Sequence, residues 1–171
     1  MIDLHFHALP GIDDGPGSME AALALLRRAQ AAGTHTVVAT PHVSANYPRT
    51  RAEDVAEGVR SLQAEAAAEG IDMRILPGAE LELMHCESLG EGELEGLRLG
   101  NSPYALVELP FTADARFAEM LLGMHANLQP LVIAHPERSR AFHADDELLG
   151  RLVGQGMLAQ VTAAPIAGSA S

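Results

Sequence analysis

Two histidines near the N-terminus have the spacing of a metal-binding pair. His5 and His7 alternate along an apolar run that begins at Met1, so a strand there would point both imidazoles to one face. Their Cβ atoms would then lie about 6–7 Å apart, which lets both rings reach one ion or two neighbouring ions. A pair of surface histidines is the alternative, and the apolar character of the run argues against it. We therefore predict that both histidines bind metal.

Two adjacent carboxylates, Asp13 and Asp14, follow in a loop bounded by Gly and Pro residues. One of them is expected to stabilise the turn, because aspartate side chains accept hydrogen bonds from nearby backbone N–H groups. A second carboxylate beside two histidines can neutralise and bridge cations. We assign this second role to Asp14.

Further candidate ligands come at the ends of later predicted strands. Each would be an unremarkable structural residue if it stood alone, but loops that follow parallel strands converge on one edge, where binding sites form. Four imidazoles and three carboxylates, without a thiolate, suit Mn, Fe or Zn better than a closed structural zinc site. The predicted ligands are His5, His7, Asp14, His42, Glu80, Glu108 and His135.

Arg138 follows His135 by three residues and is the predicted phosphate ligand, since a guanidinium can bind phosphate through two parallel hydrogen bonds. Its alternative role is an ion pair with Glu137.

Cys86 raises the alternative of a cysteine-dependent phosphatase, but that chemistry needs an arginine in the same loop, and the six residues after Cys86 contain none. We expect Cys86 to be a buried apolar residue. Surface or core packing is expected for His35, His85, His125 and His143.

The elements that must position these residues alternate between short β-rich runs and helical stretches, which predicts βα units around a parallel sheet. Strands are expected over 1–6, 36–40, 73–76, 104–109, 130–134 and 157–161. Helices are expected after an N-cap at Ser18 as far as Gly33, over 50–69 behind a Thr50/Glu53 capping box, over 113–126 and over 144–154.

Composition narrows the class of protein. With 23 acidic and 11 basic residues the net charge is −12, which argues against nucleic-acid binding, because phosphates need Lys and Arg partners. No apolar run approaches the roughly 20 residues that cross a bilayer, and the first residues lack the pattern of a signal peptide. The single cysteine cannot form an internal disulfide. We expect a cytoplasmic protein with no membrane insertion, with one domain over 1–161 and a disordered tail over 162–171.

A family resemblance is carried by the motifs MIDLHFHALPGIDDGP, ATPH, PGAE, YALVELP and AHPER, in this order. They resemble the PHP-domain (polymerase and histidinol phosphatase) superfamily, and within it the bacterial protein-tyrosine phosphatases of capsule and exopolysaccharide operons. The resemblance implies a distorted (β/α)7 barrel and a trinuclear metal centre, typically with manganese. It also implies hydrolysis of phosphotyrosine on a tyrosine autokinase. It assigns the same seven metal ligands, and it makes Arg138 the arginine that binds the substrate phosphate.

One departure from the family pattern concerns a late Asp-x-His motif and a second arginine, which these 171 residues do not contain. We therefore expect a truncated domain whose barrel lacks its last strand or strands. An open sheet edge favours association, so homo-oligomers are expected. Two or three divalent ions are expected, Mn²⁺ first and otherwise Fe or Zn. Two alternatives stay open: another phosphoesterase of this superfamily, such as one for histidinol phosphate, or an inactive metal-binding remnant.

Overall fold

The computed structural model describes residues 1–162 apart from 49, 87 and 129, and its strands are all paired in parallel. Two hydrogen-bonded sheets have the strand orders β1-β2-β4 and β3-β5-β6-β7-β8. The strands are β1 (Ile2–Phe6), β2 (Thr36–Ala39), β3 (His42–Val43), β4 (Arg74–Pro77), β5 (Glu80–Glu82), β6 (Ala105–Glu108), β7 (Leu131–Ala134) and β8 (Leu158–Gln160). The expected parallel α/β architecture is confirmed.

The two sheets are joined because β3 continues the course of β2, and β5 continues that of β4. At this bend the backbone N–H of Glu80 donates to the carbonyl of Pro41 at 3.1 Å. Gly78 allows the segment between β4 and β5 to lie close to Val38 of β2, since a Cβ at position 78 would lie 2.7 Å from Cγ1 of Val38. The strands expected over 36–40 and 73–76 therefore do not simply end before His42 and Glu80. They bend and begin again, so both residues belong to strands.

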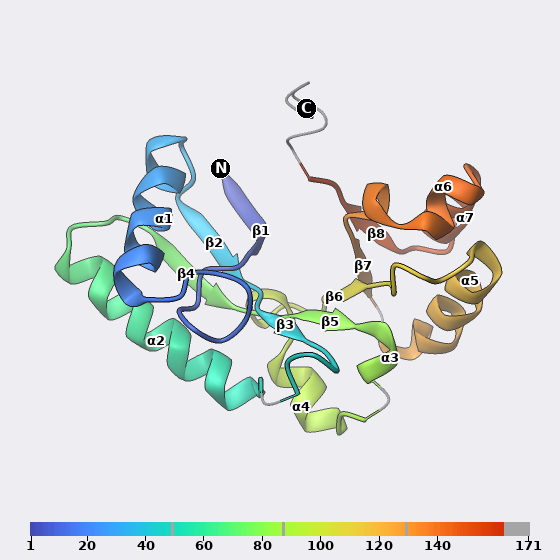
Figure 1. Ribbon diagram of the computed structural model, residues 1–171, viewed down its shortest axis with the longest axis horizontal. Helices are drawn as coiled ribbons and strands as arrows, with labels where there is room; N and C mark the ends of the chain where they lie inside the picture. Colours follow the sequence, from blue (N-terminus) through green and yellow to red (C-terminus); the bar gives the residue numbers. More distant parts are fainter. Residues whose placement is uncertain (49, 87, 129, 163–171) are drawn as a thin grey trace.

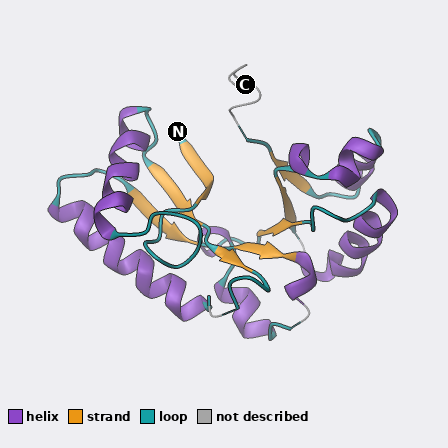
Figure 2. Cartoon of the chain, viewed as in Figure 1, coloured by secondary structure: helices purple, strands orange, loops and turns teal. Residues whose placement is uncertain are grey.

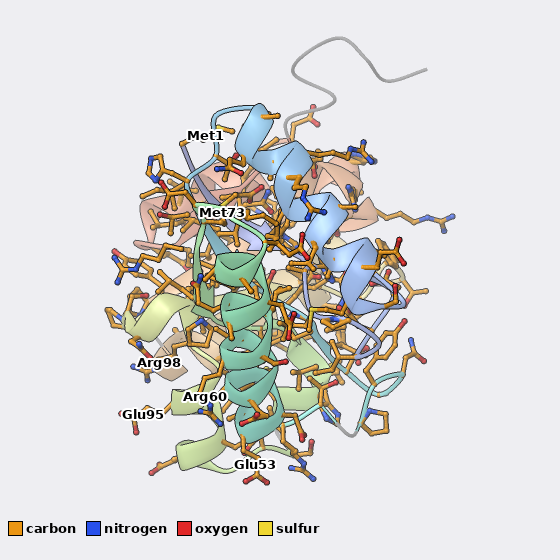
Figure 3. All side chains as sticks on the ribbon, turned by 90° about the vertical axis from the view of Figure 1, so that its left-hand side faces the viewer. Met1, Glu53, Arg60, Met73, Glu95 and Arg98 are labelled. Carbon is orange, nitrogen blue, oxygen red and sulfur yellow. The ribbon has the colours of Figure 1, made fainter. Side chains whose placement is uncertain are left out.

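Helices cover the outer face of the curved sheet, whereas the strands lie inside (Figure 2). In Figure 3, α1 and α2 lie in front of the sheet, and Glu53 and Arg60 of α2 point away from it. The α-helices are α1 (Met19–Ala31), α2 (Ala52–Ala68), α3 (Leu83–Cys86), α4 (Glu91–Gly96), α5 (Ala115–Met124), α6 (Arg140–Ala144) and α7 (Leu148–Gly154). Short 3-10 helices are η1 (Leu99–Asn101), η2 (His125–Leu128) and η3 (Pro136–Arg138).

Both faces of the central strands are buried, which explains their uninterrupted apolar sequences. In β2, Val37 and Ala39 belong to the large core beneath the helices, whereas Val38 belongs to a second cluster. Leu106 of β6 and Val132 of β7 join Val38 in that second cluster. Since side chains alternate along a strand, this second cluster lies on the face of the sheet opposite the large core.

The predicted helix boundaries need two corrections. The N-cap of α2 is Arg51 and not Thr50, one residue later than expected. The N–H of Thr50 donates to the carbonyl of Tyr47 within the preceding turn, and Asp54 instead of Glu53 accepts from the N-cap N–H of Arg51. The helix expected over 144–154 is α7, which begins later, at Leu148, and a separate helix that was not expected, α6, precedes it and ends at Ala144. Ser18 caps α1 as expected, accepting from the N–H of Ala21.

Because β3 continues β2 and β5 continues β4, the joined sheet has β1 and β8 as its two outer strands, and no pairing between them occurs among the described residues. Figure 1 shows them on the two sides of an open curve, so the described part of the barrel is not closed. No described helix combines the length and the apolar character that a membrane span requires. The tail expected over 162–171 lies outside the described residues from position 163 onward.

Candidate metal centre

Glu80, the first residue of β5, lies at the centre of a cluster of imidazoles, and its side chain is only 1% exposed. Its Oε2 lies 3.1 Å from Nε2 of His5 and 3.2 Å from Nε2 of His7. The same oxygen lies 3.2 Å from Nδ1 of His42. Its Oε1 lies 2.6 Å from Nε2 of His135. Strands β1, β3 and β5, with the end of β7, thus bring four histidines to one buried carboxylate.

Three of these atoms form a nearly equilateral triangle. Nε2 of His5 lies 3.2 Å from Nε2 of His7, and both lie at 3.1–3.2 Å from Oε2 of Glu80. Ligand atoms about 2.1 Å from a metal ion in tetrahedral or octahedral coordination are separated by about 3.0–3.4 Å. The triangle therefore fits one face of a coordination polyhedron around a divalent ion.

Two further groups of side chains could hold an ion beside this triangle. His7, Asp14 and His42 form one group, and His42, Glu80 and Glu108 form the other, with the ligand atoms of each group within 4.8 Å of one another. His7, His42 and Glu80 each occur in two of the groups, and shared ligands are typical of multinuclear sites. All the side chains predicted as ligands come together in the structure, and their binding of metal stays a prediction.

Asp13 holds His7 from the side opposite the triangle. Its buried Oδ2 lies 2.6 Å from Nδ1 of His7 and accepts from the N–H of His42 at 3.0 Å, while its Oδ1 accepts from the N–H of Gly15 at 2.9 Å. Asp14 is 64% exposed and faces the pocket. The sequence predicted one turn-stabilising and one site-facing aspartate, but it did not show that the turn residue also orients a histidine.

Gln160, the last residue of β8, is a site residue that the sequence analysis missed. Its Oε1 lies 2.8 Å from Nδ1 of His5, so it links the two outer strands β1 and β8. It also accepts from the N–H of His135 at 3.4 Å. Gln160 follows the rule that sites form where parallel strands end, since it is the last residue of β8 just as Glu108 is the last residue of β6. That rule could have found it if amide side chains had been considered.

The backbone of His135 adopts a conformation that is rare outside glycine, with φ of +29°. The residue follows β7 directly and is followed by Pro136 in η3. Such strained conformations cluster at functional sites. Here the turn keeps the imidazole buried against Glu80 instead of continuing the strand.

The buried carboxylates of the cluster need positive charge beside them. Burial favours a neutral Glu80, but hydrogen bonds from His135, His5 and His7 outweigh it and lower the pKa of Glu80 far below its usual range. Burial opposes charge on His7, yet hydrogen bonds to Asp13 and Glu80 raise its pKa to about 10. Protons on imidazoles thus balance these carboxylates in the absence of other cations.

An open pocket of about 1020 Å³ surrounds the cluster. Five carboxylate residues line it, and Arg138 is its one arginine or lysine among the described residues. A phosphate would therefore be repelled unless cations offset the carboxylates. This charge balance, together with the N/O donor set, fits divalent metal ions.

Arg138 ends η3 and is exposed in the pocket. No ion pair with Glu137 occurs within the described part of the chain, and one Glu137 oxygen instead accepts from the N–H of Thr162 at 3.1 Å. The guanidinium is therefore available to an anion.

The residues that were not predicted as site residues lie apart from the cluster. Cys86 is 3% exposed, and burial raises the pKa of its thiol to about 12. The pocket lining does not include His35, His85, His125 or His143.

Comparison with known proteins identifies the family. Residues 1–171 match the family described as Capsular polysaccharide synthesis, CpsB/CapC. The chain belongs to the CpsB/CapC family. This CpsB/CapC chain is 33% identical over 169 residues to tyrosine-protein phosphatase YwqE of Bacillus subtilis, across 98% of the chain and 66% of the relative.

Two other relatives are similarly distant. The putative tyrosine-protein phosphatase CapC of Staphylococcus aureus is 30% identical over 98% of the chain and 66% of the relative. Tyrosine-protein phosphatase CpsB of Streptococcus pneumoniae is 32% identical over 94% of the chain and 67% of the relative. The CpsB/CapC chain thus spans about two thirds of the length of these relatives.

A solved structure supports the fold. It comes from work on YwqE from Bacillus subtilis and CpsB from Streptococcus pneumoniae, described as unique metal-dependent tyrosine phosphatases. It matches with a TM-score of 0.84 and 33% identity, over 98% of this chain and 68% of the other. The predicted α/β fold and the predicted family are confirmed, and the open parallel sheet is consistent with a PHP-type barrel.

Proposed function

We propose that this CpsB/CapC chain carries the metal centre of a phosphatase that hydrolyses phosphotyrosine in proteins. The observation that carries the proposal is the triangle formed by His5, His7 and Glu80, which lies in an open pocket beside the exposed Arg138. A metal centre beside a free guanidinium suits a phosphate monoester. The activity named for YwqE and CpsB supports phosphotyrosine as the substrate.

The metal ligands and Arg138 would have different roles in such a reaction. Bound divalent ions would polarise the phosphoryl oxygens and lower the pKa of a water nucleophile. His5, His7 and Glu80 would hold one ion, and Asp14, His42 and Glu108 would supply ligands for ions beside it. Arg138 binds phosphoryl oxygens and offsets the charge that develops on them.

A protein nucleophile is not needed. The thiol of Cys86 is buried, lies outside the pocket lining and donates to the carbonyl of Glu82 at 3.5 Å. With its pKa raised to about 12 it stays protonated at neutral pH and is a poor nucleophile.

The finer assignments belong to the same proposal. We propose Mn²⁺ as the metal, ahead of Fe and Zn, because Mn²⁺ binds to carboxylate and imidazole ligands and the site contains no thiolate. Two or three ions fit the three overlapping groups of side chains. The proposed partner is a tyrosine autokinase that controls capsule or exopolysaccharide synthesis, in the cytoplasm.

Hydrolysis of a phosphotyrosyl peptide, in parallel with histidinol phosphate and a phosphoseryl peptide, tests the proposal. The chain should be treated with EDTA, dialysed, and assayed with and without added Mn²⁺. We expect release of phosphate from the phosphotyrosyl peptide that depends on Mn²⁺ and exceeds that from the other two esters.

Other outcomes would identify the alternatives. Preference for histidinol phosphate would indicate a small-molecule phosphatase with the same metal centre. Stoichiometric metal binding without hydrolysis of any ester would indicate a metal-binding chain without this activity. Hydrolysis that survives EDTA would contradict the proposed role of the metal centre.

A further inference from the structure

Phe111 lies at the rim of the pocket with 59% of its surface exposed. Aromatic residues are scarce in this protein, which has four Phe, two Tyr and no Trp. Among the described residues, one Phe and one Tyr line the pocket of the metal centre, Phe111 and Tyr47. A large exposed aromatic side chain beside a binding site is a candidate contact for a ligand.

The exposure of Phe111 is imposed by a tight turn. The N–H of Ala113 donates to the carbonyl of Pro110 at 2.9 Å, which places Phe111 at the tip. The residues on each side of this turn are anchored, because Leu109 is 3% exposed and Ala113 is 5% exposed. The turn begins two residues after Glu108, the last residue of β6, so the ring is placed relative to the metal centre by a short, anchored connection.

Tyr47 provides a second aromatic wall. Its ring stacks on that of His42, with 5.7 Å between the centroids and 6° between the planes. It follows β3, whereas Phe111 follows β6, and β5 lies between these two strands in the sheet. The aromatic side chains therefore come from loops two strands apart, with Glu80 of β5 between them in the sheet order.

We infer that Phe111 is a specificity-determining residue that contacts the aromatic ring of aryl phosphate substrates. The inference rests on the proposed function, because it assumes that the phosphate binds at the metal centre beside Arg138. In an aryl phosphate the ring begins at the ester oxygen, so when the phosphate is bound the ring lies beside it, among the residues that line the same pocket. Aromatic pairs gain affinity beyond the area they bury, whereas an alkyl phosphate offers no ring for such a contact.

The test compares phenylphosphonate with methylphosphonate, in which the phosphonate stands in for the phosphate and cannot be hydrolysed as an ester. Binding to the Mn²⁺-treated chain is measured by calorimetry for the parent, Phe111→Ala and Phe111→Leu. We expect the parent to prefer phenylphosphonate and Phe111→Ala to reduce that preference by about 10-fold. Phe111→Leu should give an intermediate value, because it keeps apolar bulk without an aromatic ring.

The matched control is Met120→Ala, which removes a side chain of similar exposure (55%) on α5, outside the pocket lining. It should leave the preference unchanged, and circular dichroism should show that each variant is folded. No preference in the parent, including no binding of either phosphonate, would overturn the inference. So would a preference that Phe111→Ala retains. Failure of the proposed function is distinguished from this result, because it is measured separately, in the hydrolysis of the three esters with and without Mn²⁺.

Discussion

Nδ1 of His7 lies 2.6 Å from Oδ2 of Asp13, and the aspartate side chain is fully buried. A carboxylate accepts hydrogen bonds only, so this contact keeps the proton of a neutral His7 on Nδ1. The lone pair of Nε2 then points towards His5 and Glu80, where the triangle of ligand atoms lies. Partners of this kind orient histidine ligands in many metal sites.

Asp13→Asn should weaken metal binding although the residue is not itself a predicted ligand. The carboxylate faces three N–H groups, from His7, His42 and Gly15, and an asparagine would direct its NH₂ group at one of them. We expect the affinity for Mn²⁺ to fall by about 10- to 100-fold. Calorimetric titration measures it, with Asp72→Asn, an exposed aspartate, as the control. Equal affinities in the two variants would show that Asp13 only stabilises the turn.

Replacing His5 and His7 together by alanine should remove at least one ion. Both are corners of the triangle, and only Glu80 would remain there. Elemental analysis after dialysis gives the number of ions per chain. The control replaces His35 and His85, which do not line the pocket. The metal centre would have to be sought elsewhere if the variant and the parent held equal amounts of metal.

Arg138→Ala should impair catalysis without loss of metal. The guanidinium is exposed in the pocket, and the ligand groups do not include it. We expect kcat/KM for a phosphotyrosyl peptide to fall by about 10²-fold, as for other residues that stabilise transition-state charge. Weaker inhibition by inorganic phosphate should accompany the loss, and Arg140→Ala, an exposed neighbour, should change neither. A parallel loss of metal would indicate a structural role for Arg138 instead.

Cys86 should be unreactive and dispensable. Its thiol has a pKa raised by burial to about 12, so it stays protonated throughout the neutral range. At pH 8 the folded protein should resist alkylation by iodoacetamide, whereas the protein in urea should react. Cys86→Ser should keep its hydrolytic activity and its sensitivity to EDTA. Rapid alkylation of the folded protein with loss of activity would instead favour a cysteine nucleophile.

Metal binding should release protons and strengthen as pH rises. In chelator-treated protein, hydrogen bonds to Asp13 and Glu80 outweigh burial and raise the pKa of His7 from 6.5 to about 10. The stability that charged His7 contributes is therefore fully present below about pH 6.5 and is lost as pH rises through about 10. An ion needs the neutral imidazole, so Mn²⁺ affinity should increase over this range.

Calorimetry at pH 7.5 in buffers of different ionisation enthalpy gives the number of protons released. We expect metal binding to release at least about one proton per chain in the parent, and fewer protons when His7 is replaced by alanine. A binding enthalpy that is independent of the buffer would contradict the prediction.

Placement at the ends of predicted strands was sufficient to predict that five side chains meet in the pocket. His5, His42, Glu80, Glu108 and His135 come from separate predicted strands, and parallel strands with short connections place their ends at one edge. The alternation of β-rich runs with helices was likewise sufficient for the α/β fold, because these patterns record which faces of each element are buried.

Only the tertiary structure decided how these residues are related to one another. Asp13 and Asp14 are adjacent and chemically identical, yet one is buried against His7 and the other is exposed, because the turn points them in different directions. Glu80 became the shared centre because β4 bends into β5 at Gly78, a contact between strands that no local pattern encodes. Gln160 reaches His5 across 155 positions of sequence. Distances of this kind depend on how the sheet curves in space, and curvature follows from packing among many residues instead of from the spacing of a few.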